Sequence, residues 1–247
     1  MSEPGYAPYK PQLIPIKWAD NVWIVDGPEV SYKLAGMAIP CPTRMTVVRL
    51  ADGTLWLHSP VIYSAALANA LGQIGEIHAI VGPNSYHHVH INEWKSNLPN
   101  VKVYACSELL RRFGKSNNWL TIESAHEYWS NVFDHVVCDL GQFEEVVFFH
   151  RPSRTLIVTD LMQNFEAGRI RSPLIRFLLW AGGAIGPNGG TSIEIRLAGF
   201  NKRKKLRVQL RQITAWQPSS IILSHGLCYK TNVEAELQRA FAWVGAS

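Results

Sequence analysis

The order of apolar patterns along the chain is the feature that most constrains its fold. Short runs rich in β-branched and aromatic residues, which are typical of strands, alternate with stretches in which apolar residues recur at helical spacing. The strands that we predict are Asn21–Asp26, Met45–Leu50, Thr54–His58, Ile77–Val81, Val101–Ala105, Glu145–Phe149, Thr155–Thr159 and Ser220–Leu223. Helices are predicted after Ser64, over Asn92–Asn97, over Leu206–Trp216 and over Val233–Val244. Two sheets packed face to face, with helices on their outer sides, would bury the apolar faces of both sheets. We therefore expect an α/β fold, a four-layer α/β/β/α sandwich.

The chain is expected to form a single domain over residues 1–247. Its 247 residues are enough to bury one large core, and no Pro/Gly/Ser linker divides them. Residues 1–20 predict an extended N-terminal arm, and residues 28–44, which contain three prolines, predict a loop. The pair Asp52-Gly53 between two β-rich runs predicts a tight hairpin, because the turn needs positive φ angles.

Charge, cysteine content and hydropathy narrow the cellular setting. The formal net charge is +5, and much of the excess lies in the run Lys202–Lys205. The four cysteines (Cys41, Cys106, Cys138 and Cys228) show no paired spacing, and the start of the chain does not resemble a signal peptide. We therefore expect free thiols and a cytoplasmic protein. The longest apolar run, Leu174–Ile185, is shorter than the ~20 residues that a membrane span needs.

Side chains that can bind a metal follow three of the predicted strands. The cluster His87-His88-Val89-His90 comes after the fourth strand, Asp160 after the seventh and His225 after the last. A hydrolytic zinc or iron site uses three or more His, Asp or Glu ligands and keeps one position open. Neighbouring residues of an extended segment face opposite sides, so only one of His87 and His88 can point inward, and we prefer His88. The side chains expected to converge at one edge of the two sheets are Asn84, His88, Asp160 and His225.

This order of parts resembles the metallo-β-lactamase superfamily. In that fold a hairpin ends in an L-I-D-x-G-like segment, and later strands end in H-x-H-x-D-H, in an Asp and in Gly-His or His-Gly. The segments that carry the resemblance are Leu55–Pro60, Ile80–His88, Leu156–Asp160 and Ile222–Gly226, and the match extends over residues 20–245. Phe148–Leu156 is similar to an uncharacterised branch of the superfamily, carried as a domain of unknown function. The resemblance implies a hydrolase-like protein that depends on a metal.

The metal motif departs from the family pattern. In one alignment Asn84 and Tyr86 replace the first two histidines of H-x-H-x-D-H, and in a second alignment the motif begins at His88. The loop 140–143, where the family has a further histidine, offers no ligand. Only Asp160 and His225 match the pattern without a shift. We therefore expect at most one divalent ion, zinc or iron, with no bound metal as the alternative.

The residues and the resemblance together imply roles for individual side chains. The expected metal ligands are His87, His88, His90, Asp160 and His225, and the expected catalytic residues are His88, Asp160 and His225. Four further side chains are expected to orient the ligands or to bind substrate, namely His58, which stands where the family has an Asp, with Asn84, Tyr86 and Arg44.

Three functions follow as hypotheses. The first is a metal-dependent hydrolase that acts on an ester, a lactone or a similar carbonyl of a small-molecule substrate. The second is a non-catalytic descendant that binds or scaffolds and has lost its metal. The third, less favoured, is an RNA-processing relative that uses a basic helical face formed by Lys204, Arg207 and Arg211. Nucleic-acid binding is not expected, because no RNA-binding motif accompanies that face.

The segment Arg169–Ile185 is apolar and has basic flanks. Pro173 is typical of a first helical turn, so the segment predicts a helix packed on the sandwich. A lid, an oligomer contact through residues 169–185 and a membrane-surface helix are the alternatives.

Overall fold

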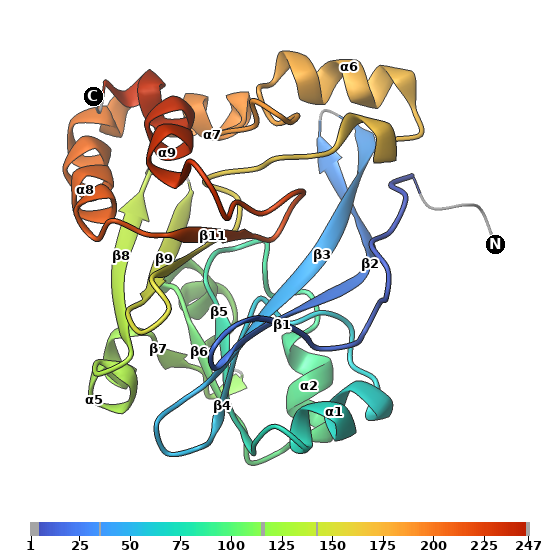
Figure 1. The fold of residues 1–247 in the computed structure, drawn as a ribbon, viewed down its shortest axis with the longest axis vertical. Helices are drawn as coiled ribbons and strands as arrows, with labels where there is room; N and C mark the ends of the chain where they lie inside the picture. The colour runs from blue at the N-terminus through green and yellow to red at the C-terminus, as the bar shows by residue number, and fades with distance from the viewer. Residues whose placement is uncertain (1–4, 35, 115–116, 142, 246–247) are drawn as a thin grey trace.

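Two β-sheets packed face to face form the centre of the molecule (Figure 1). The structure is a computed structural model that describes residues 5–34, 36–114, 117–141 and 143–245. The first sheet has seven strands in the order β1 (Ile16–Ala19), β2 (Val22–Leu34), β3 (Met37–Arg49), β4 (Leu55–His58), β5 (Ile77–Gly82), β6 (Lys102–Ala105) and β7 (Leu120–Thr121). The second has four strands in the order β11 (Ser220–Leu223), β10 (Thr155–Val158), β9 (Glu144–His150) and β8 (Phe133–Asp139).

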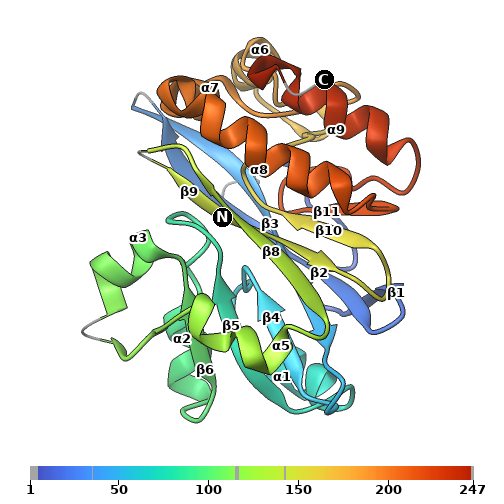
Figure 2. The same cartoon turned by 90° about the vertical axis from the view of Figure 1, so that its left-hand side faces the viewer.

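Helices cover the outer face of each sheet, as Figure 2 shows. On the side of the seven-stranded sheet lie α1 (Ala65–Gly72), α2 (Ile91–Asn97), α3 (Ser107–Leu109), the π-helix η1 (Leu110–Gly114), η2 (Glu123–Ala125) and α5 (His126–Trp129). On the side of the four-stranded sheet lie α7 (Ile193–Ala198), η4 (Phe200–Lys202), α8 (Arg203–Ala215), α9 (Val233–Phe241) and η5 (Ala242–Val244). The short η3 (Ala167–Arg169) and α6 (Pro173–Ala181) lie at one edge of the molecule. The expected four-layer α/β/β/α sandwich is confirmed.

The strands of the small sheet are apolar on both faces because each face meets a different core. In β9, Val146 and Phe148 belong to the core shared with the large sheet, whereas Val147 and Phe149 face the core under the helices. Successive side chains of a strand point to opposite faces, so a continuous apolar run is what a sheet between two layers requires. The loops that leave β5, β10 and β11 carry the polar residues described below.

The first hairpin is much longer than expected. The loop expected over residues 28–44 is wrong, because most of these residues lie in β2 and β3, two strands of thirteen residues each that pair with an irregularity between Gly27 and Val30. Proline is tolerated where a strand has only one neighbour. Pro40 and Pro42 satisfy this condition, since β4 pairs with β3 only over Thr46–Arg49. The sequence predicted a loop because prolines are rare inside strands, and it did not show that this part of β3 has only one neighbouring strand.

Local signals elsewhere agree with the structure. The Ser64 hydroxyl accepts a hydrogen bond of 3.1 Å from the Leu67 amide and caps α1, and Gly53 takes a φ of +85° in the hairpin between β3 and β4. The N-terminal arm ends in β1, and its Tyr6 ring is buried against Phe165. All four cysteines are free. None of the helices in the described ranges has the length and apolar character to cross a bilayer.

Candidate metal centre

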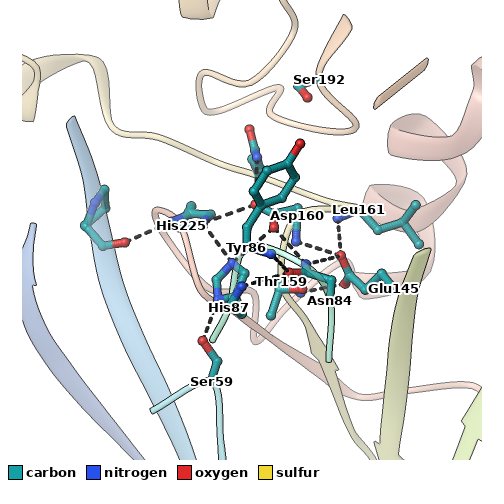
Figure 3. A network of polar contacts seen from close by, with 12 residues as sticks. Ser59, Asn84, Tyr86, His87, Glu145, Thr159, Asp160, Leu161, Ser192 and His225 are labelled. Atoms are coloured by element: carbon teal, nitrogen blue, oxygen red, sulfur yellow. Dashed lines mark hydrogen bonds and ion pairs between the residues drawn. The ribbon is translucent and has the colours of Figure 1, made fainter. Parts of the chain in front are cut away.

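Three side chains from three different loops point toward one another at the edge of the two sheets (Figure 3). His87 follows β5, Asp160 follows β10 and His225 follows β11. The Nε2 atom of His87 lies 3.1 Å from Asp160 Oδ2, and the Nε2 atom of His225 lies 3.2 Å from Asp160 Oδ1. The two Nε2 atoms are 3.2 Å apart. One donor atom from each residue therefore falls within a group whose members all lie within 4.8 Å of one another.

Hydrogen bonds on the far side of each imidazole fix its orientation. His225 Nδ1 lies 2.8 Å from the carbonyl oxygen of Pro42, which can only accept, so Nδ1 carries the proton. The His225 ring also stacks on Phe165 with an interplanar angle of 3°. Nδ1 of His87 lies 2.5 Å from the Ser59 hydroxyl. Both histidines thus present Nε2 to the centre, the arrangement typical of imidazoles that bind metals.

Asp160 is the negative member of the group. Burial alone would raise the pKa of Asp160, but His87 and His225 beside it hold that pKa well below its ordinary value. The carboxylate also accepts hydrogen bonds from Asn84 Nδ2 at 2.8 Å and from Gln163 Nε2 at 3.2 Å. Two imidazole nitrogens and one carboxylate converge with their lone pairs toward one point. This donor set fits a single zinc or iron ion, since catalytic zinc uses three protein ligands and non-haem iron uses two His and one carboxylate.

Glu145 organises the loop that carries Asp160. Its side chain is completely buried, and its two oxygens accept hydrogen bonds of 2.7 to 2.8 Å from the amides of Thr159, Asp160 and Leu161. Burial raises the pKa of Glu145 and the neighbouring Asp160 adds to the rise, while the amides of Thr159 and Leu161 oppose it. Sequence analysis missed this residue. The available signal was weak, because Glu145 directly follows Glu144 at the start of the apolar run Val146–Phe149.

Asn84 links two of the three ligand loops. Its amide nitrogen donates to Asp160 and, at 2.9 Å, to the Thr159 hydroxyl. Its carbonyl oxygen accepts from the backbone amides of Tyr86 and His87 at 2.9 and 3.0 Å. That oxygen is therefore occupied by the His87 loop. Asn84 lies at the centre, as expected, and it holds both ligands in place.

His87, and not His88, faces the other ligands, so the expected preference for His88 is wrong. The expectation assumed an extended segment, whereas residues 85–90 form turns between β5 and α2. The His88 ring packs instead on Phe113, with ring centroids 4.9 Å apart. His90 pairs with Glu93, at 3.3 Å between Nδ1 and Oε2. Neither His88 nor His90 belongs to the converging group found among the described residues.

Arg44 anchors the His225 loop, as the first of its two expected roles required, and it does not line the cavity formed by the described residues, as substrate binding would require. Its Nε donates to Asp26 Oδ1 at 2.8 Å. Its NH1 lies 2.7 Å from the carbonyl oxygens of both Leu223 and Gly226, which flank His225. A buried guanidinium with these partners is satisfied within the protein. The sequence could not show this, because the partners are about 180 positions away along the chain.

His58 does not orient a ligand, although it was expected to. Its ring is buried against Trp56 and Phe148, and burial together with His87 lowers the pKa of His58 to about 3. The next residue, Ser59, takes over the orienting role through its bond to His87. Ser59 has a φ of +54°, which turns its hydroxyl out of the strand direction. That positive φ next to Pro60 was not apparent in the sequence.

A cavity of about 690 Å³ opens onto His87, Asp160 and His225. Tyr32 and Tyr86 form part of its wall, with ring centroids 5.3 Å apart in an edge-to-face arrangement. Glu194 and Ile195 from α7 form another part. Glu194 Oε2 is buried and has no hydrogen-bond partner within the described part of the chain. In the loop expected to lack a ligand, Gln142 lies outside the described residues.

Comparisons with known proteins agree with this fold. The TMB-1 structure, described for substrate and inhibitor binding, has a TM-score of 0.55 and 13% identity, over 95% of this chain and 99% of that one. A metallo-β-lactamase from Erythrobacter litoralis has a TM-score of 0.57 and 8% identity, over 94% and 96% of the two chains. The FIM-1 metallo-β-lactamase from Pseudomonas aeruginosa, in its mono-zinc form, has a TM-score of 0.51 and 11% identity, over 98% and 97%.

At such identities the likeness shows the fold alone. No curated protein matches the chain. A family model described as a domain of unknown function (DUF4336) matches residues 19–170, which is more than half of the chain. The chain therefore belongs to the DUF4336 family, and its fold is that of the metallo-β-lactamases.

Proposed function

We propose that the protein is a metal-dependent hydrolase that cleaves an ester, a lactone or a similar carbonyl compound. The observation that carries the proposal is the convergence of His87, Asp160 and His225 at a cavity large enough for a small molecule. These three side chains would hold one divalent ion, zinc or iron. Such an ion supplies Lewis acidity, which polarises a carbonyl group and makes water a stronger acid.

Neighbouring residues of the chain would hold the three ligands in the orientation that binds an ion. Ser59 and the Pro42 carbonyl hold both imidazoles with Nε2 toward the centre. Asn84 and Gln163 donate hydrogen bonds to Asp160 and fix the direction of its carboxylate. Because three donors converge, the site has room for one ion, and we expect at most one per chain.

The cavity wall suggests how a substrate would be oriented. Tyr32 and Tyr86 offer aromatic faces for an apolar part of the molecule. The buried Glu194 Oε2 would accept a hydrogen bond from a substrate hydroxyl, amide or ammonium group, because an unmatched buried acceptor costs free energy that a ligand can recover. His88 lines the same cavity, so we assign it to substrate contact and not to the ion.

Elemental analysis after dialysis tests the metal site. We expect up to one zinc or iron per native chain, loss of that ion in His87→Ala and His225→Ala, and retention in His88→Ala, which is the matched control from the same turn. Hydrolysis of aryl esters and lactones should be lost with the ion in His87→Ala and His225→Ala, whereas His88→Ala, which keeps the ion and loses a substrate contact, should remain active with a raised KM. Two ions per native chain would contradict the single site. No ion in any sample, together with metal-independent melting, would favour the non-catalytic descendant.

A further inference from the structure

An unusual concentration of exposed apolar side chains lies on α6, α7 and η4. Six of the twelve large apolar side chains that are exposed in the described residues fall within 27 consecutive positions. They are Leu174, Phe177, Trp180, Ile193, Leu197 and Phe200, with exposed fractions of 50 to 68%. We call these six residues the α6–η4 surface. Clusters of this kind on a folded protein mark binding surfaces.

The α6–η4 surface is built on connected elements. The end of α6 joins the start of α7 through a hydrogen bond of 2.9 Å from the Ile193 amide to the Gly182 carbonyl. The rings of Phe177 and Trp180 lie 5.9 Å apart on one turn of α6. Figure 1 places α6 and α7 along the same edge of the molecule. The helix α6 has no fully buried residue, so its outer face lacks a partner within the described chain.

The charge of the same segment is strongly one-sided. Residues 167–205 contain eight Lys or Arg and one Asp or Glu, which gives the segment a formal charge of +7, while the whole chain has +5. The remaining residues are therefore net negative. Two of the eight cations pair with carboxylates outside the segment, Arg169 with Glu166 and Lys205 with Asp139. The one acidic residue, Glu194, lines the cavity. Apolar side chains and positive charge thus occur together in this part of the chain.

This combination distinguishes between possible partners. A second copy docked on the same surface would bring two positively charged segments together, because an isologous interface pairs a patch with itself. An anionic partner avoids that repulsion. Anionic lipid headgroups attract Lys and Arg, and the boundary below them accepts the side chains of Trp, Phe and Leu, as in helices that lie in the plane of a bilayer.

We propose that the α6–η4 surface docks on an anionic membrane surface. In the docked state Trp180, Phe177 and Leu174 would enter the headgroup boundary, and the exposed side chains of Arg176, Lys202 and Lys204 would contact lipid phosphates. The neighbouring wall of the cavity would then lie close to the bilayer, because Ile193 belongs to the surface and Glu194 and Ile195 line the cavity. The proposal does not depend on the metal or on hydrolysis.

Vesicle flotation with the full chain tests the proposal. The vesicles are phosphatidylcholine alone, or phosphatidylcholine with about a third phosphatidylglycerol. We expect binding to the anionic vesicles, weaker binding at 0.5 M salt, and at least about a tenfold loss of affinity in the double variant Phe177→Ser/Trp180→Ser. The matched control is Val208→Ser/Leu227→Ser, which removes two equally exposed apolar side chains from outside the surface and should bind as the native protein does.

Circular dichroism and thermal melting are used to check that both double variants fold, so that a loss of binding reports on the surface. Equal binding to neutral and anionic vesicles, or no binding to either, would overturn the proposal. A dimer in analytical ultracentrifugation that only Phe177→Ser/Trp180→Ser dissociates would instead identify a second copy as the occupant. Retention of single-stranded RNA in place of vesicles would identify a nucleic acid, and would overturn the proposal in the same way.

Discussion

The Ser59 hydroxyl lies 2.5 Å from Nδ1 of His87, on the side of the ring opposite Asp160. We predict that Ser59→Ala lowers the affinity for zinc about 10- to 100-fold, because the imidazole loses the contact that orients it. The free energy of unfolding of the metal-free protein should change by less than about 1 kcal/mol. Competition with a chelator measures the first quantity and urea denaturation the second.

Ser64→Ala is the matched control for that variant. This serine caps α1 and is remote from the ligands, so its loss should lower the free energy of unfolding by about 1 kcal/mol and leave zinc affinity unchanged. An equal loss of zinc affinity in both variants would show that Ser59 does not orient His87.

Glu145→Gln should destabilise the protein much more than its neighbour Glu144→Gln. The Glu145 carboxylate accepts hydrogen bonds from three buried backbone amides. A glutamine has only one acceptor oxygen, and its NH₂ group would face the amide donors. We expect a loss of about 3 kcal/mol in the free energy of unfolding for Glu145→Gln. Glu144 is more exposed, and its variant should lose less than about 1 kcal/mol. Similar losses in both variants would contradict the organising role of Glu145.

Stability should fall on acidification partly through His150. Burial lowers the pKa of His150 to about 4, whereas the unfolded chain binds the proton with a pKa of ~6.5. The unfolded state therefore takes up a proton first, and the stabilisation that is present above about pH 6.5 is lost progressively as the pH falls toward 4. His150→Gln, which keeps an acceptor for Ser153, should flatten this part of the stability profile. An unchanged slope between pH 6.5 and 4 would show that other groups cause it.

The four cysteines give a test of the proposed cytoplasmic setting. Thiol titration of unfolded, unreduced protein should count four thiols, because all four are free in the structure. Under native conditions Cys106 and Cys138 should react slowly, since both are buried and burial raises the pKa of the Cys106 thiol to about 12. A count of two after unfolding would indicate a disulfide and an oxidising compartment.

The sequence predicted the parts of the site that depend on where strands end. Asp160 and His225 follow short apolar strands, and parallel neighbours in one sheet bring their ends together, as β10 and β11 do. The choice between His87 and His88 depended on a turn. That turn is set by the hydrogen bonds from the amides of Tyr86 and His87 to Asn84, which no periodicity reveals.

Contacts between segments that are distant along the chain could not be predicted from the sequence either. Arg44 was expected to orient a ligand or to bind substrate, and its acceptors are Asp26 on the neighbouring strand and the carbonyls of Leu223 and Gly226 at the end of β11 and just after it. Its true partners depend on how the two sheets pack. The long hairpin was missed for a related reason, since Pro40 and Pro42 are compatible with a strand only if one side has no neighbour.

The hydrogen bonds of Arg44 to the carbonyls of Leu223 and Gly226 show that the loop carrying His225 is anchored differently from the walls of the cavity. The ligand loops are tied to the body of the sandwich by Arg44, Glu145 and Asn84. Much of the wall that a substrate would touch comes from other elements, the β2–β3 hairpin and α7. Changes in those walls can accumulate without moving the three ligands. The geometry of His87, Asp160 and His225 can therefore stay constant during evolution while the molecules that the cavity accepts change.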